Sequence, residues 1–452
     1  MQKFFQAGSA KVSQWLINRE FALFWSGQSI SVIGDYLFDT TLIIWVADSV
    51  ARGTEWAPLA VTGVLLATVI PILVLGPLAG VFVDRWNKRR TMLYMDAIRT
   101  ILIIVLMLST GIIPLPFLAN GKLSIVWQLS IIYSIVFLST TCAQFFNPSR
   151  FAFSADIVKE ADIVHSTSLT QTATSIASIL GPAIAGPLYF GFGVQWALLI
   201  EAFSFSISFF TIRAVNTPYK IQDSEPEENS KFFHEFREGF LFCLQNRVLN
   251  TILIVGILFM FGVGALNALD IFFVTQNLRA SPGFFGFLDA AWGIGSIIGS
   301  IVASSIMRRY GVVAAMWVSV IAVGLSIIIY ARQTSLFPAL LFLFFFGFPN
   351  AVTNITFRPL TLAVTPRGLV GRVISLLVTA ISIAEMLSVA IVGSLESTAF
   401  HGFHKTILGI SFGSIDTIFS ISGLLIIAGG IYSGFILNAD QRLKKGQASP
   451  EE

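Results

Sequence analysis

The stretch Gly76-Pro-Leu-Ala-Gly-Val-Phe-Val-Asp-Arg-Trp-Asn-Lys-Arg-Arg90 decides the fold, because it joins one long apolar segment to the next. Gly76 and Gly80 are four residues apart, a spacing that lets two helices in a membrane approach closely. The basic cluster from Arg85 to Arg90 follows at once. Such a cluster beside an apolar segment is typical of the cytoplasmic side of a membrane protein.

The whole chain is too apolar for a water-soluble protein. Of its 452 residues, 55% are hydrophobic and only 12% are charged, whereas soluble domains carry roughly 25% charged residues. We therefore expect most of the surface to face lipid. Two cysteines, Cys142 and Cys243, give neither a disulfide framework nor a metal-binding spacing.

Twelve segments of the chain are long and apolar enough to cross a membrane, which takes about 20 mostly apolar residues. Their apolar runs are continuous, whereas a membrane β-barrel shows alternating segments of about ten residues. The sequence therefore predicts an all-α membrane protein with twelve transmembrane helices in two pseudo-symmetric six-helix bundles. The segments lie near 21–47, 57–82, 92–113, 123–146, 167–190, 194–214, 248–275, 284–306, 312–330, 335–357, 371–395 and 414–437.

The positions of the basic residues predict the orientation. Of the 28 lysines and arginines, 22 fall at the termini and in alternate loops, 5 fall in the intervening loops, and Arg99 lies within the third segment. Cytoplasmic loops carry the excess of Lys and Arg, so both termini are expected in the cytoplasm. We predict a multi-pass protein of a cell membrane, the inner or plasma membrane of a bacterium.

Composition divides the chain into five parts. An amphipathic, cytoplasmic N-terminal segment covers 1–19, and it shows no cleavable signal peptide. Six-helix bundles are predicted over 20–215 and 248–437. Residues 216–247 form a polar cytoplasmic linker that ends in an amphipathic helix, and 438–452 form a cytoplasmic tail.

The two halves carry an internal repeat. Gly76-x-x-x-Gly80 is followed by Arg89-Arg90, and Gly295-x-x-x-Gly299 is followed at the same distances by Arg308-Arg309. Internal repeats with a binding site between them are typical of secondary transporters.

The pattern Gly80-x-x-x-Asp84-Arg85-x-x-Lys88-Arg89-Arg90 resembles the cytoplasmic loop signature of the major facilitator superfamily, with Asn87 in place of the usual glycine. The resemblance implies a conformational latch made by Gly80, Asp84, Arg85, Lys88, Arg89 and Arg90. The alternative is that these charges fix topology alone.

Further motifs are similar to those of macrolide efflux proteins and the enterobactin exporter. They are Phe24-Trp25-x-Gly27-Gln28, Gly34-Asp35-x-Leu37-Phe38, Asn147-Pro148-x-Arg150 after the fourth segment, Gly181-Pro182-x-x-x-Gly186 in the fifth, and Gly371-Arg372-Val373 opening the eleventh. Gly181-Pro182 and Gly186-Pro187 also resemble an antiporter signature, although its fuller glycine spacing is absent. We predict helix packing at Gly76, Gly181, Pro182 and Gly186, and an inner gate at Arg150 and Arg372.

An ionisable residue within a spanning helix is a functional hypothesis by default. In the first segment Gln28, Ser31, Asp35 and Asp39 share one helix face. Two carboxyl groups one turn apart resist ionising together, so one could hold and exchange a proton. Asp35 and Asp39 are predicted proton-coupling residues, and the alternative is a structural hydrogen bond to a neighbouring helix.

Glu385 is the third predicted proton-coupling residue, because it ends a polar stripe in the eleventh segment. Glu201, Asp270 and Asp289 are weaker candidates, since each lies near the outer surface, where a carboxylate could simply reach water. We predict a substrate cavity lined by Gln28, Ser31, Tyr36, Gln171, Asn267, Asp289, Trp292 and Ser382.

No nucleotide-binding loop, metal constellation or nucleophile–base pair is evident in the sequence, so neither an enzyme nor a cofactor is predicted. His401-x-x-His404 is interpreted as a solvated pair in a loop. The favoured function is proton-coupled efflux of drug-like or amphipathic molecules by alternating access, from a monomer that binds no nucleic acid. The alternatives are a lysophospholipid flippase or an importer of the same fold, or a non-transporting membrane receptor.

Overall fold

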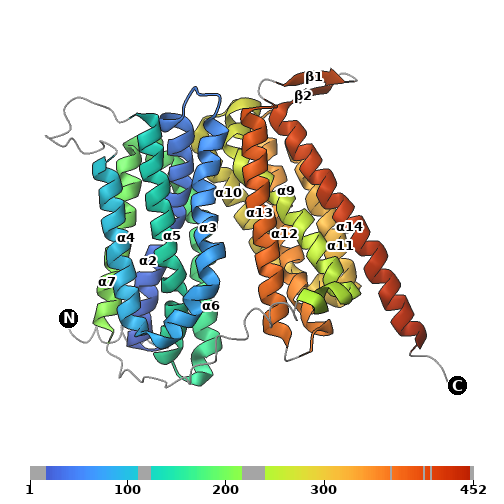
Figure 1. The fold of residues 1–452 in the computed structure, drawn as a ribbon, viewed down its shortest axis with the longest axis horizontal. Helices are drawn as coiled ribbons and strands as arrows, with labels where there is room; N and C mark the ends of the chain where they lie inside the picture. The colour runs from blue at the N-terminus through green and yellow to red at the C-terminus, as the bar shows by residue number, and fades with distance from the viewer. Residues whose placement is uncertain are drawn as a thin grey trace, which may run out of the picture. The chain divides into compact units, whose positions relative to one another are not determined.

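The computed structural model describes residues 17–109, 124–215, 240–366, 369–400, 403–407 and 410–447, which are almost entirely helical (Figure 1). The long helices are α2 (Arg19–Trp45), α3 (Ala57–Arg85), α4 (Lys88–Ser109), α5 (Ile125–Asp156), α6 (Ile163–Phe192), α7 (Val194–Ala214), α9 (Arg247–Phe272), α10 (Phe285–Tyr310), α11 (Val312–Ala331), α12 (Leu336–Val364), α13 (Val370–Ser397) and α14 (Ser414–Gln447). Among the described residues, twelve helices are long and apolar enough to cross a membrane. The predicted fold class is thereby confirmed.

Several helices are longer than the apolar runs that predicted them. α5 continues through Pro148 to Asp156, and α12 continues through Pro359 to Val364. The motif around Asn147 therefore lies inside a helix, and its predicted position after the helix is wrong. Proline is tolerated in membrane helices because neighbouring groups satisfy the carbonyl that loses its N–H partner.

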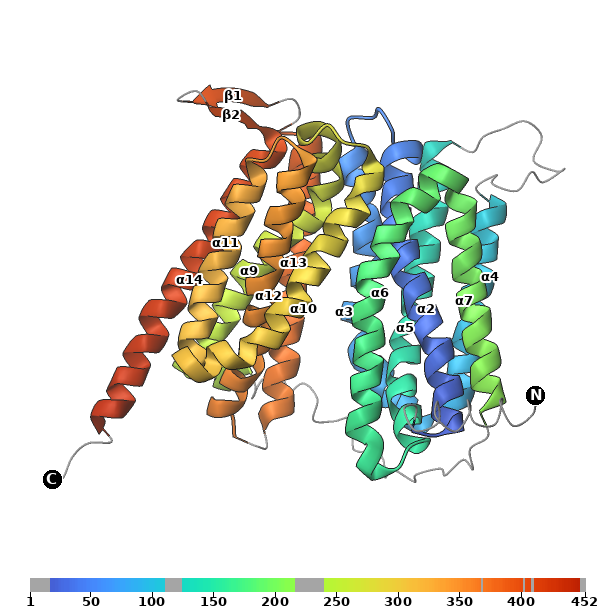
Figure 2. The ribbon, with the colours of Figure 1, turned by 180° about the vertical axis from the view of Figure 1, so that it is seen from behind.

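Two compact units make up the chain. The first comprises Met1–Arg52 and Ala67–Glu225, and the second comprises Gly53–Leu66 and Pro226–Glu452. In the first unit α2 packs against α6 and α7, and α4 packs against α5 and α7 (Figure 2). In the second unit α9 packs in the same way against α13 and α14, and α11 packs against α12 and α14. The internal repeat is therefore visible in the helix pairings as well as in the sequence.

Helices α2 and α9, which are equivalent in the repeat, have the same structures at both ends. An asparagine caps each N-terminus: Asn18 Oδ1 accepts from Phe21 N at 2.7 Å, and Asn246 Oδ1 accepts from Val248 N at 3.0 Å. This contact satisfies a backbone N–H that has no partner within the helix. Each helix then ends in a π-helical turn, Val46–Val50 after α2 and Phe273–Asn277 after α9.

Close contacts between helices explain why two positions, Gly181 and Gly295, are occupied by glycine. A Cβ atom placed on Gly181 of α6 would lie 2.6 Å from Tyr36 Cβ and 2.8 Å from Leu37 N of α2. A Cβ atom on Gly295 of α10 would collide with the carbonyl oxygen of Phe344 in α12. Only glycine lets these backbones come so near.

Two features differ from the predicted loops and tail. A short antiparallel hairpin, β1 (His404–Ile407) with β2 (Ile410–Gly413), occupies the predicted last loop. The tail predicted from residue 438 begins inside α14, which reaches Gln447 because residues 438–447 contain no proline. Residues 1–16 and 216–239, and with them most of the predicted linker, lie outside the described residues, as does His401.

Candidate functional site

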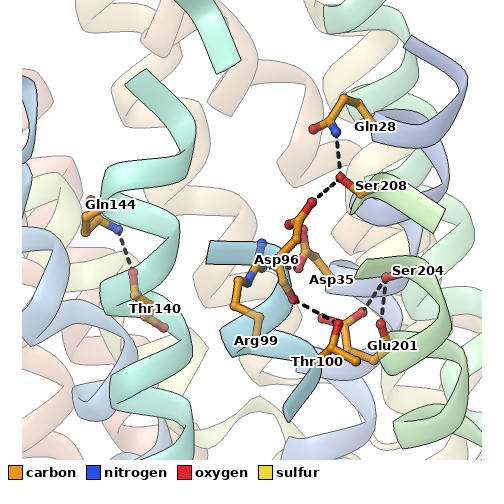
Figure 3. Close-up of polar contacts among 10 residues, drawn as sticks. All are labelled: Gln28, Asp35, Asp96, Arg99, Thr100, Thr140, Gln144, Glu201, Ser204 and Ser208. Atoms are coloured by element: carbon orange, nitrogen blue, oxygen red, sulfur yellow. Dashed lines mark hydrogen bonds and ion pairs between the residues drawn. The ribbon is translucent and has the colours of Figure 1, made fainter. Parts of the chain in front are cut away.

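Arg99 stands at the centre of a charged cluster in the first unit (Figure 3). It lies in the middle of α4 and is 7% exposed. One of its terminal nitrogens lies 2.6 Å from Asp35 Oδ1 on α2, and its guanidinium carbon lies 3.8 Å from the ring centroid of Phe205 on α7. A guanidinium in an apolar helix bundle needs such partners, because an isolated buried charge is very costly.

A second carboxylate, Asp96, lies one helical turn before Arg99 and is fully buried. Ser208 Oγ of α7 donates a hydrogen bond to Asp96 Oδ2 at 2.5 Å, and Gln28 Nε2 of α2 donates to Ser208 Oγ at 2.7 Å (Figure 3). This chain of polar groups joins α2, α4 and α7 inside the unit.

The third carboxyl group of the cluster, Glu201 on α7, is 2% exposed and lies against α2, because a Cβ atom placed on Gly34, the neighbour of Asp35, would lie 2.6 Å from Glu201 Oε2. Ser204 Oγ also donates to Glu201 Oε2 at 3.3 Å. Asp35, Asp96 and Glu201 thus lie around the guanidinium of Arg99. Carboxyl groups gathered in a buried site resist ionising together.

The sequence prediction and this cluster overlap only in part. Asp35 belongs to it, whereas Asp39 is exposed one turn further along α2. Gln28 and Ser31 are 4% and 3% exposed and lie between helices, so they do not line an open cavity as predicted. Glu201 was expected to reach water, and its burial shows that this interpretation is wrong.

Sequence reasoning missed Asp96 and did not assign Arg99 a partner. A usable signal was present, since Asp96-x-x-Arg99 is an oppositely charged i, i+3 pair inside an apolar segment. Glu201, Ser204 and Ser208 also form a polar stripe on α7, with steps of three and four residues. This stripe faces Gln28 and Asp35 on α2.

The second unit contains a cavity of about 540 Å³ between α9, α12 and α13. Two predicted residues of α13, Ser382 and Glu385, contribute to its wall. The predicted Asn267 of α9 donates to Glu385 Oε1 at 3.0 Å. The other lining residues are Gly256, Phe259, Met260, Asn354, Phe357, Arg358, Thr361, Ile374, Leu377, Val378 and Ile381.

Asp270 forms a separate polar contact in the second unit. It is 6% exposed, and Tyr330 Oη of α11 donates to its Oδ1 at 2.5 Å. Phe273 and Phe419 pack on the Tyr330 ring, with centroids 4.7 and 6.2 Å away. The expectation that this carboxyl group reaches water is therefore wrong. The predicted cavity residue Asp289 is half-buried.

The remaining predicted cavity and gate residues differ in their exposure. Trp292 is 37% exposed and Gln171 is exposed. Tyr36 and the proposed gate residues Arg150 and Arg372 are half-buried. Their roles stay predictions.

The described part of the predicted latch ties together helices of the first unit. Lys88 Nζ lies 3.1 Å from Asp156 Oδ2 on α5, and Arg89 donates to the carbonyl oxygens of Ile212 and Arg213 at the end of α7. Arg90 is exposed. Asn87 Oδ1 caps α4 by accepting from the backbone N–H of Arg90 at 3.0 Å, a side-chain hydrogen bond that glycine cannot form, although glycine is also tolerated at this position of a helix.

Three other predicted packing residues, Gly76, Pro182 and Gly186, lie within α3 and α6. Pro182 and Gly186 are buried, and a Cβ atom on Gly76 would meet Gln144 Oε1 at 3.5 Å, an ordinary contact distance. The surroundings of Gly80, Asp84 and Arg85 lie outside the described side chains.

Comparison with known sequences gives matches over most of the chain. The family described as transmembrane secretion effector matches residues 13–408. Macrolide efflux protein A of Streptococcus pyogenes is 24% identical over 319 residues, which are 71% of this chain and 74% of that protein. BacE of Bacillus subtilis, described as a candidate bacilysin exporter, is 31% identical over 223 residues, which are 49% of this chain and 50% of that protein.

Solved structures with the same fold are transporters of several kinds. The nucleoside transporter NupG superposes with a TM-score of 0.70 at 13% identity, covering 92% of this chain and 98% of that one. A bacterial homologue of the iron transporter ferroportin, in its inward-facing state, gives a TM-score of 0.66 at 14% identity and covers 92% and 97%. At such identities the likeness extends to the fold alone.

Proposed function

The chain belongs to the transmembrane secretion effector family, within the major facilitator transporters, and we propose that it exports drug-like or amphipathic molecules by proton-coupled alternating access. It is a membrane transporter and not an enzyme, since its relatives include efflux proteins. We propose that inward proton flow drives export, so that the protein works as an antiporter. We also propose that it is a monomer in a bacterial inner membrane, with both termini in the cytoplasm.

The gathering of three carboxyl groups around one buried guanidinium is the observation that carries the proposal. Asp35, Asp96 and Glu201 lie around the guanidinium of Arg99, so full ionisation would leave excess negative charge in a low-dielectric bundle. Such excess is costly, and binding a proton removes it. The excess of negative charge favours a proton on one of these carboxyl groups, and a proton-driven transporter requires such a group within the membrane.

Proton binding in this cluster can also move helices, by changing the ion-pair partner of Arg99. Arg99 can form a close ion pair with Asp35 of α2 or with Asp96 of its own helix. A proton on Asp35 weakens its attraction to Arg99 and favours the turn toward Asp96, whose Oδ2 already accepts from Ser208 of α7. The two arrangements connect α4 differently to α2 and α7, as a two-state element in alternating access requires.

The proposal is tested in proteoliposomes with an imposed pH gradient, ethidium as an amphipathic cationic substrate, and a trapped pH dye. Wild type should accumulate ethidium against its gradient only while the pH gradient lasts. Asp35→Asn and Glu201→Gln should lose this uphill transport about tenfold or more, while downhill exchange persists. Asp39→Asn is expected to have a smaller effect, because Asp39 stands outside the buried cluster.

Glu160→Gln is the matched control, since Glu160 is an exposed carboxylate in the same unit. Uphill transport that survives without a pH gradient would refute proton coupling. Full coupling in the variant with both Asp35→Asn and Asp39→Asn would do the same. Movement of a fluorescent lysophospholipid in place of ethidium would indicate a flippase, and uptake in the opposite direction would indicate an importer.

A further inference from the structure

The cavity of the second unit carries opposite charges at two different heights. Arg358 on α12 and Glu385 on α13 both contribute to its lining. Arg358 is exposed and Glu385 is half-buried. Within the described part of the chain neither of them forms an ion pair. Each charged group is thus available to a molecule in the cavity.

Helix geometry gives the separation of the two charges. Residues 365–369 join α12 to α13, so both helices reach the same end of the unit (Figure 1). Arg358 precedes the end of α12 at Val364 by six residues, and Glu385 follows the start of α13 at Val370 by fifteen. At 1.5 Å per residue the two backbone positions lie about 9 and about 22 Å from that end, so they differ in height by about 13 Å.

The wall between the two charged residues is mainly apolar. It consists of aromatic and aliphatic side chains from all three helices, among them Phe259, Leu377 and Ile381. The neutral polar groups Asn354 and Ser382 are also present. A cavity of this volume fits a drug-sized ligand, and a few polar groups in an apolar wall fix such a ligand's orientation.

We propose that this cavity binds amphipathic zwitterions, with the cationic group at Glu385, the anionic group at Arg358 and an apolar body between them. The assignment rests on the proposed function, since it takes the cavity to be where the cargo binds. A cationic amine bound at Glu385 would share the carboxylate with Asn267, which already donates to Oε1. A carboxylate or phosphate suits the planar guanidinium of Arg358, whose N–H groups can contact two oxygens at once.

Four forms of one tripeptide, Phe-Leu-Phe, test the assignment because they share an apolar body. The free peptide is a zwitterion whose extended chain spans about 10 Å, and the side chains of Arg358 and Glu385 shorten the gap that it must bridge. N-acetylation leaves only the anion, C-amidation leaves only the cation, and both together leave a neutral molecule. Dissociation constants are measured by calorimetry on the full chain in lipid nanodiscs.

The zwitterion should bind most tightly to wild type, and each cap should weaken binding about tenfold, as expected for the loss of one charge-assisted contact. Glu385→Gln should abolish the effect of N-acetylation while that of C-amidation remains. Arg358→Gln should do the reverse. Arg308→Gln, an exposed arginine of the same unit outside the cavity lining, should leave all four constants unchanged.

Equal affinity of wild type for all four forms, or no binding of the zwitterion, overturns the assignment without any variant. A uniform loss across the four peptides in Glu385→Gln and Arg358→Gln overturns it as well. Binding is measured without a pH gradient, so its failure leaves the evidence for proton coupling intact. A failure of coupling in the liposome assay likewise leaves the measured charge selectivity intact.

Discussion

Replacing Arg99 by methionine should destabilise the first unit strongly, because the change keeps the apolar stem and removes the guanidinium that lies 2.6 Å from Asp35 Oδ1. Breaking a buried ion pair by removing one partner costs about 3–5 kcal/mol, and the cost here should lie at the lower end of that range because the Asp35 side chain is 34% exposed. The lost stacking on Phe205, at 3.8 Å, accounts for about 1–2 kcal/mol of this. Arg99→Lys keeps the charge but loses the stacking on Phe205, so it should cost only about 1–2 kcal/mol, which is what the stacking contributes.

Asp35→Asn provides the partner for a double-mutant cycle. With Asp35 already neutral, Arg99→Met leaves less uncompensated charge, so its added cost should be about 1.5–3 kcal/mol smaller than in wild type. The free energy of unfolding is measured by titrating dodecyl sulfate into mixed micelles and following helix content. Additive effects of the two substitutions, or a cost below about 1 kcal/mol for Arg99→Met, would refute the view that this ion pair organises the unit.

Five further substitutions have clear expected outcomes in the same unfolding assay. Gly181→Ala should cost about 1–3 kcal/mol, because the new Cβ meets the α2 backbone, whereas Gly191→Ala should be neutral, since nothing lies within 4 Å of that position. Tyr330→Phe should cost about 1–3 kcal/mol because Asp270 loses its donor. Asn87→Ala should cost about 1 kcal/mol through loss of the α4 cap, and Asn87→Gly only a few tenths; equal costs for the two would contradict the capping role.

Local signals in the sequence were enough for the helices. Apolar length predicted all twelve spans, and the spacing of glycines and basic pairs predicted the repeat. Helix ends were less accurate, as in α5, where the predicted segment ended at residue 146 and the helix continues through Pro148 to Asp156. Inside a bundle the carbonyl that loses its partner can be satisfied by a neighbouring helix, a compensation that a linear pattern does not encode.

The charged cluster required knowledge of which helix faces meet. Periodicity alone placed Asp35 and Gln28 on one face of α2, and this face was interpreted as the wall of a cavity. It instead meets the polar stripe of α7, which contains Glu201 and Ser208. Asp35 and Arg99 are 64 residues apart, so their ion pair depends on tertiary packing. Combining polar stripes of different helices would have improved the prediction.

The repeated units have diverged in where they place their ionisable groups. In the first unit Asp96, Arg99 and Glu201 are buried between packed helices, which leaves no volume for a bulky molecule beside them. In the second unit Glu385 and Arg358 line an open cavity large enough for cargo. A proton needs only a chain of hydrogen-bonding groups, whereas an amphipathic molecule needs volume and apolar walls. We therefore propose that the same helix pairings serve proton exchange in one unit and cargo binding in the other. The liposome experiment tests the first role, and the calorimetric experiment tests the second.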